Sequence, residues 1–202
     1  MPLWLAAAPL ILASRSHVRR SLLEGAGVPV EVEPADIDER AVEARAPLQA
    51  PVAIAALLAR EKALATARQK AGRLVLGADQ ILSLEGRRFS KPADRSAALV
   101  QLRALSGRTH ELYSAIAFAE DASVPFEHVA VARLTMRTLS DRFLHSYLDA
   151  VGDAATASVG AYQLEGLGIQ LFERVDGDYF TVLGLPLMTV LEFLRRRGYL
   201  SP

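Results

Sequence analysis

Residues 10–24, LILASRSHVRRSLLE, pass directly from an apolar run into hydroxyl and guanidinium groups and then into a helical pattern. We expect a short buried strand that ends at Ala13, with Ser16 capping the helix that follows. Basic residues in a first turn are repelled by the positive end of the helix dipole, and a bound anion would offset that repulsion. Ser14 and Arg19 are therefore candidate ligands of an anion, and phosphate fits best. The alternative is an ordinary strand, cap and helix with a solvated basic first turn.

The rest of the chain alternates helical and strand patterns. Helices are expected over 52–70, 94–105, 140–148 and from 186 to before 198. Strands are expected over 28–32, 74–82, 109–119 and 126–137, with 169–175 and 179–182 forming a hairpin, and with an acidic loop at 36–39 and a glycine-rich loop at 160–168. The pattern predicts an α/β fold with a mixed β-sheet flanked by helices. A length of 202 residues allows one domain or two tightly joined lobes, and we interpret residues 1–202 as a single domain.

The balance of charge and the absence of cysteine exclude several functional classes for this chain. The 23 basic and 23 acidic side chains cancel, so no global field draws the chain to nucleic acid or to an anionic membrane. The absence of cysteine excludes disulfides, thiolate zinc sites and a cysteine nucleophile. Residues 3–13 have the apolar character of a signal-peptide core, but no Lys or Arg precedes them. No apolar run approaches about 18 residues, so we expect a cytoplasmic protein without a transmembrane span.

Three charged residues stand out, two on elements that are otherwise apolar and one in a loop. Asp79 is the lone carboxylate in the expected strand 74–82, and a buried Asp is rare unless it is paired, bound to metal or catalytic. The alternative is a strand-end Asp bonded to backbone amides. Lys62 lies on the edge of the apolar face of helix 52–70, where a lysine usually snorkels to solvent. Lys91 precedes Pro92, and we expect it to face the same cleft as Asp79.

Several common catalytic motifs are missing from the sequence. There is no GxxxxGK[ST] phosphate loop, no GxGxxG after a strand and no GxSxG, and the four histidines lack zinc-ligand spacing. The remaining set is Ser14, Arg19, Lys62 and Lys91 as anion contacts, with Asp79 and Glu39 as carboxylates for metal or water. That set suits phosphoryl chemistry, in which neutralisation of charge dominates catalysis.

The same positions lie in motifs that resemble those of the Maf family of nucleotide pyrophosphatases. The matching segments are LILASRSHVRRSLL at 10–23, AREKA at 59–63, LGADQ at 76–80, KP at 91–92, LSGRTH at 105–110, VGAYQLEGLG at 159–168 and DGDYFTVLGLPL at 176–187. The resemblance covers nearly the whole chain. It implies a fold like that of Maf and ITPase proteins with a nucleotide cleft, and hydrolysis of nucleoside triphosphates to monophosphate and pyrophosphate with a divalent cation such as Mg²⁺ or Mn²⁺. Housecleaning of non-standard nucleotides and a homodimer are also implied.

The resemblance also implies a role for each site residue. Ser14, Arg19, Lys62 and Lys91 match the phosphate ligands, Asp79 matches the general base or a metal ligand, and Glu39 matches an acidic position that contacts the metal. Asp79 would then orient and deprotonate the water that attacks the α-phosphorus, while the metal and the lysines take up developing charge.

The choice of base depends on three further positions. Gln80 and Glu165 match the branch of the family that acts on 7-methylguanosine triphosphate, whereas the dTTP and UTP branch has threonine and glutamine there. A carboxylate accepts from the N1 and N2 donors of guanine, and a cationic methylated ring favours it further. Val18 departs from both branches, which carry an aromatic or an arginine. Gln163 and Tyr162 are secondary candidates for base binding, although Tyr162 fits a core position better.

Two other functions remain open at this point. One is a weakly catalytic nucleotide-binding regulator of cell division, which accumulation of pyrophosphate with turnover would distinguish from an enzyme. The other is a phosphate- or RNA-binding module, which the neutral charge and the lack of a clustered aromatic surface disfavour.

Overall fold

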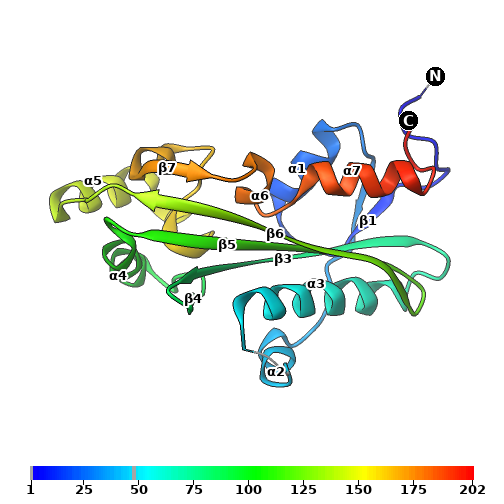
Figure 1. The fold of residues 1–202 in the computed structure, drawn as a ribbon, viewed down its shortest axis with the longest axis horizontal. Coiled ribbons are helices and arrows are strands. Elements are labelled where there is room, and N and C mark those ends of the chain that lie inside the picture. The colour runs from blue at the N-terminus through cyan, green and yellow to red at the C-terminus, as the bar shows by residue number, and fades with distance from the viewer. Residues whose placement is uncertain (1, 47–48) are drawn as a thin grey trace.

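A computed structural model describes residues 2–46 and 49–202, and it contains one seven-stranded mixed sheet in the order β2-β1-β3-β5-β6-β7, with β4 paired to β3 (Figure 1). The strands are β1 (Leu10–Leu12), β2 (Val30–Val32), β3 (Leu74–Leu84), β4 (Arg87–Phe89), β5 (Thr109–Glu120), β6 (Ser123–Met136) and β7 (Phe172–Asp176). The pairs β1–β2 and β1–β3 are parallel, and the other pairs are antiparallel. The predicted α/β fold with a mixed sheet is confirmed.

Helices cover both faces of the sheet. They are α1 (His17–Gly25), α2 (Glu39–Ala44), α3 (Pro51–Ala67), α4 (Arg95–Leu105), α5 (Asp141–Val151), α6 (Tyr179–Val182) and α7 (Leu187–Arg196), with short 3-10 turns at Gly152–Thr156, Val159–Ala161 and Leu167–Leu171. Figure 1 shows α3 along one face of the long strands β3, β5 and β6, α7 along the other, and α4 and α5 at one end. Among the described residues, no helix is both long and apolar enough to cross a membrane.

Side-chain caps explain where most of the helices begin. Ser16, Asp94 and Ser140 each accept a hydrogen bond from a first-turn amide, as the sequence predicts. Asp38 and Asp178 cap two further helices in the same way. Each such cap contributes about 1 kcal/mol to the stability of its helix.

Those two additional helices correct the sequence interpretation. Residues 36–39 were expected to form a loop, but Asp38 accepts a hydrogen bond from Ala41 N at 3.0 Å and α2 begins at Glu39. The expected hairpin of 169–175 with 179–182 is also wrong. The Asp178 carboxylate accepts from Thr181 N and so starts the helical turn α6, while β7 pairs with β6 instead.

The close approach of α3 to β3 fixes the geometry of the centre of the molecule. A Cβ atom at Gly77 would lie 2.2 Å from the carbonyl oxygen of Ala59 and 2.6 Å from the amide nitrogen of Ala63, so only glycine fits there. Side chains two apart on a strand share a face. Asp79 therefore faces α3, the helix that carries Lys62, whereas Gln80 faces the opposite side, toward α6.

Candidate active site

One cavity of about 1190 Å³ brings together all the site residues predicted from the sequence. Its lining includes Ser14, Val18, Arg19, Glu39, Lys62, Asp79, Gln80, Lys91 and Glu165. These residues come from the segment after β1, α1, α2, α3, β3, the segment after β4 and the loop before β7. The arrangement agrees with the prediction of a cleft, while the role of each residue stays a prediction.

Arg19 lies at the junction of three elements. Its Nη1 donates to Ser14 Oγ at 3.1 Å and to the Ala78 carbonyl at 2.9 Å, and its Nε donates to the Gly184 carbonyl at 2.8 Å. Burial lowers the pKa of Arg19, and the charges of Asp79 and Glu39 oppose that effect, so the guanidinium stays ionised. Because several of its donors are bound within the protein, Arg19 orders Ser14 and β3 as well as supplying positive charge to the cleft.

Lys62 bridges two of the carboxylates that line the cavity, Asp79 and Glu39. Its Nζ lies 2.6 Å from Asp79 Oδ1 and 2.8 Å from Glu39 Oε1. The Lys62 side chain is only 13% exposed, so it does not snorkel to solvent. Burial raises the pKa of the Asp79 carboxyl, whereas the adjacent charges of Lys62 and Arg19 lower it and favour the ionised form. A raised pKa brings a carboxylate closer to the pH at which the enzyme works. A general base is most effective when its pKa lies near that pH.

The two carboxylates that contact Lys62 are candidate ligands of a metal ion. Among residues 2–46 and 49–202, no group of three or more His, Cys, Asp or Glu is placed to hold a metal ion. Asp79 and Glu39 nevertheless converge, since both reach the same Lys62 nitrogen. Mg²⁺ is commonly held by one or two carboxylates together with substrate phosphates, so these two oxygen donors fit a cation that is completed by the nucleotide.

The mouth of the cavity carries additional charge. Lys91 is exposed, and it forms no ion pair within the described part of the chain. Arg88 and Glu43 also line the cavity, and they pair with Nη1 2.8 Å from Oε2, which links β4 to α2. Sequence reasoning missed this pair because the two residues lie in separate elements with no local pattern that connects them.

Gln80 has its amide group bound to the protein. Its Nε2 lies 2.9 Å from Ser114 Oγ, 3.2 Å from the Thr181 carbonyl oxygen and 3.0 Å from the Val182 carbonyl oxygen. Ser114 Oγ itself donates to the Thr181 carbonyl at 2.7 Å, so all three partners act as acceptors toward Gln80. Gln80 lines the cavity, and its Oε1, the acceptor end of the amide, forms no hydrogen bond among the described residues.

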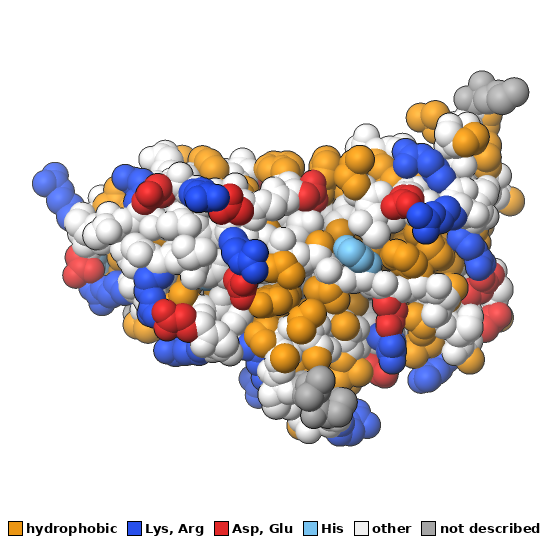
Figure 2. All heavy atoms as spheres, viewed as in Figure 1, with side chains coloured by type: hydrophobic (Ala, Val, Ile, Leu, Met, Phe, Trp, Pro, Cys, Tyr) orange, Lys and Arg blue, Asp and Glu red, His pale blue; other side chains and the backbone are white. Residues whose placement is uncertain are grey.

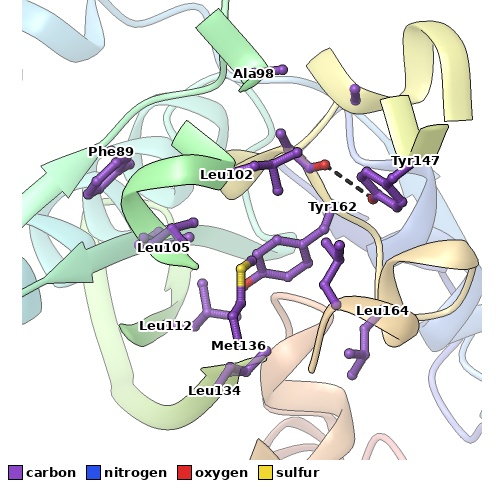
Figure 3. Close-up of a cluster of buried hydrophobic side chains, with 14 of the residues drawn as sticks. Phe89, Ala98, Leu102, Leu105, Leu112, Leu134, Met136, Tyr147, Tyr162 and Leu164 are labelled. Carbon is purple, nitrogen blue, oxygen red and sulfur yellow. Dashed lines mark hydrogen bonds between the residues drawn. The ribbon is translucent and has the colours of Figure 1, made fainter. Parts of the chain in front are cut away.

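Glu165 and Tyr162 belong to one loop and both line the cavity, but they differ in burial. Glu165 is exposed and lines the cavity. Tyr162 is only 5% exposed and packs within the cluster of buried side chains that surrounds α4 and α5, as the sequence predicts for a core residue. Figure 3 shows its ring at the centre of that cluster. Val18 lines the cavity as well, and its aliphatic side chain offers no ring for stacking on a base.

Comparison with known proteins agrees with the motifs and the geometry. The family model described as Maf-like protein matches residues 9–197. The chain is 53% identical over 201 residues to the nucleoside triphosphate pyrophosphatase of Rhodopseudomonas palustris (strain BisB18) and 55% identical over 201 residues to that of Nitrobacter winogradskyi (strain ATCC 25391 / DSM 10237 / CIP 104748 / NCIMB 11846 / Nb-255), each match covering 100% of both chains. It is 49% identical over 191 residues to the 7-methyl-GTP pyrophosphatase of Brucella abortus biovar 1 (strain 9-941), covering 93% of this chain and 95% of that one. This chain therefore belongs to the Maf-like protein family.

Proposed function

We propose that 7-methyl-GTP is the favoured substrate of this nucleoside triphosphate pyrophosphatase, and that its role is to remove such non-standard nucleotides. The observation that carries the proposal is the acceptor character of Gln80 and Glu165, two side chains that line the cavity. Gln80 uses its NH₂ group on Ser114, Thr181 and Val182, which leaves Oε1 as the end of the amide available to a ligand, and Glu165 contributes a carboxylate. Guanine presents N1–H and N2–H₂ as donors, which two acceptors satisfy.

The placement of charges around Asp79 supports the following reaction. Asp79, oriented by Lys62, accepts a proton from the water that attacks the α-phosphorus, and the bond between that phosphorus and the bridging oxygen to the β-phosphate breaks. Arg19 and Ser14 hold the phosphate chain from the start of α1, and Lys91 contributes charge from the segment after β4. The developing negative charge leaves with pyrophosphate, so the cationic side chains lower the barrier by electrostatic stabilisation.

We further propose that a divalent cation of the Mg²⁺ or Mn²⁺ type joins the nucleotide to the two carboxylates. Asp79 and Glu39 would hold it, because they are the acidic groups that converge at Lys62. When bound, such a cation neutralises charge on phosphate oxygens. Lys62 would then keep its ion pair with either Asp79 or Glu39 and orient that carboxylate. Asp79 would act either as the general base or as a ligand of the cation.

The alternative substrates are dTTP and UTP. They stay in consideration because Val18 offers no ring to stack on a methylated purine, although it also departs from the arginine of the pyrimidine branch. The test is a panel of nucleoside triphosphates assayed for pyrophosphate release with Mg²⁺ and with Mn²⁺. The proposal predicts a higher kcat/KM for 7-methyl-GTP than for GTP, UTP or dTTP, and it fails if a pyrimidine nucleotide is preferred. Nucleotide binding without accumulation of pyrophosphate would instead indicate a regulator.

A further inference from the structure

We propose that His110 is a positioning residue for base recognition: through Tyr162 it holds the loop of residues 159–168 in the conformation that presents Glu165 to the nucleotide. The inference rests on the proposed function, because it concerns recognition of the base at that same cavity. His110 does not line the cavity, so it acts only through the loop.

The contact between His110 and Tyr162 is buried and specific. His110 Nε2 lies 2.7 Å from the Tyr162 hydroxyl, and the two residues are 0% and 5% exposed. The two rings pack at 5.6 Å, and Phe172 lies against both, at 5.9 Å from His110 and 4.8 Å from Tyr162. Burial lowers the pKa of His110 to about 4, which keeps the imidazole neutral near pH 7.

The other ring nitrogen of His110 points to a role beyond packing. Nδ1 is buried and has no hydrogen-bond partner among residues 2–46 and 49–202. An unsatisfied buried polar atom is costly, so a phenylalanine at this position would serve a purely apolar core better. What histidine adds is its single polar contact, and that contact is to the loop tyrosine.

The loop needs such an anchor because its backbone is strained. Gly160 and Ala161 have φ values of 78° and 61°, and a left-handed conformation is unfavourable for alanine. The Tyr147 hydroxyl donates to the Ala161 carbonyl at 3.2 Å, a bond visible in Figure 3, and Gln101 Oε1 accepts from Gly160 N at 3.2 Å. His110 adds a third tether from β5, so side chains of three different elements hold this short segment.

The compact fold of residues 159–168 couples the position of Tyr162 to that of Glu165. A Cβ atom at Gly160 would lie 2.6 Å from the Tyr162 ring, so the ring seats directly on the strained segment. At the far end, a Cβ at Gly168 would lie 2.3 Å from the Gln163 carbonyl oxygen, so the loop folds back against itself. Glu165 lies between these two close approaches. Movement of Tyr162 therefore displaces the carboxylate that faces the cavity.

The test compares His110→Phe, His110→Gln, Tyr162→Phe and the double variant His110→Phe/Tyr162→Phe, with Tyr113→Phe as the matched control. Tyr113 bonds Glu111 on the same strand as His110 but does not line the cavity. The readout is the ratio of kcat/KM for 7-methyl-GTP to that for UTP, which does not depend on the fraction of folded enzyme. We expect His110→Phe and Tyr162→Phe each to lower the ratio by about tenfold through KM, and the double variant to lower it no further, as for two residues in one network.

A conservative variant and hydrogen exchange distinguish a positioning role from a contribution to stability. In His110→Gln the side-chain amide takes the place of Nε2, so we expect this variant to keep most of the parent's kcat/KM ratio, unlike His110→Phe. We expect Tyr113→Phe to leave the ratio unchanged. Amide hydrogen exchange should speed up in peptides spanning 159–168 in His110→Phe and not elsewhere. An unchanged ratio together with unchanged loop exchange overturns the inference, and an unchanged ratio with faster exchange reduces His110 to a structural role. If the parent protein prefers UTP, the proposed substrate fails, while the change in ratio still tests His110.

Discussion

Lys62 Nζ lies 2.6 Å from Asp79 Oδ1, and the two side chains are 13% and 12% exposed. They come from α3 and β3, which pack closely at Gly77. A buried ion pair of this kind is costly to desolvate and is weak evidence for a contribution to stability. Its position in the cavity, with Glu39 on the same nitrogen, supports a role in ordering the carboxylate that we propose as the general base.

Removing the Lys62 charge should change the pH dependence of the reaction as well as its rate. The Lys62 charge lowers the pKa of Asp79 against the raising effect of burial, so in Lys62→Met that pKa rises. A base must be ionised to work, and the acid limb of the kcat/KM profile should therefore move to higher pH, with turnover reduced roughly 10²-fold.

Lys91→Ala is the matched comparison for that variant. Lys91 is not among the charges that influence the Asp79 pKa, so we expect a similar loss of turnover without movement of the acid limb. If both variants give the same pH profile, Lys62 is a phosphate ligand only and does not tune Asp79.

Glu165→Gln should shift base preference toward pyrimidines. The substitution replaces a pure acceptor by a group that also donates, which the pyrimidine edge requires. A misplaced polar contact costs about 1–3 kcal/mol, so the ratio of kcat/KM for 7-methyl-GTP to that for UTP should fall about tenfold or more. We expect a partial switch, because Gln80 still presents an acceptor. An unchanged ratio would remove Glu165 from the specificity site.

Gly77→Ala should separate α3 from β3. The added methyl group would lie 2.2 Å from a backbone carbonyl that belongs to a regular helix, so α3 must shift at a cost of about 1–3 kcal/mol. Urea unfolding measures this cost. The control is Gly25→Ala, where nothing lies within 4 Å of the new Cβ. Equal midpoints for the two variants would contradict the packing described.

Protonation of His110 should contribute to acid unfolding. Burial lowers its pKa from an ordinary 6.5 to about 4, so between these values the unfolded chain binds a proton that the folded chain does not. The associated stability, roughly 3 kcal/mol by linkage, is complete above pH 6.5 and is lost as the pH falls toward 4. His110→Phe should therefore lose less stability over this window than the wild type. His145→Gln, at an exposed position on α5, should retain the wild-type slope.

Local sequence patterns predicted the elements that depend on neighbouring residues. The caps at Ser16, Asp94 and Ser140 follow from a hydroxyl or carboxylate placed before a helical period. The helical turn α6 was missed, because its four residues are too few for a period and resemble a strand, while its cap, Asp178, lies in the expected hairpin turn.

Contacts between distant residues were beyond what local patterns reveal. The candidate site residues were found by charge and by resemblance to a family, but nothing in the sequence indicated that Gln80 uses its amide on residues 181 and 182, about a hundred positions away. The pairing of His110 with Tyr162, 52 residues apart, is similarly invisible. Such contacts arise from sheet order and packing, which a local pattern does not encode.

The most direct test of the account is a single turnover of 7-methyl-GTP in ¹⁸O-labelled water with a divalent cation present. Attack at the α-phosphorus predicts 7-methyl-GMP and pyrophosphate, with the label in the monophosphate, and a rate about 10² or more slower in Asp79→Asn. Appearance of 7-methyl-GDP with labelled orthophosphate, or an unimpaired Asp79→Asn variant that folds normally, would contradict it.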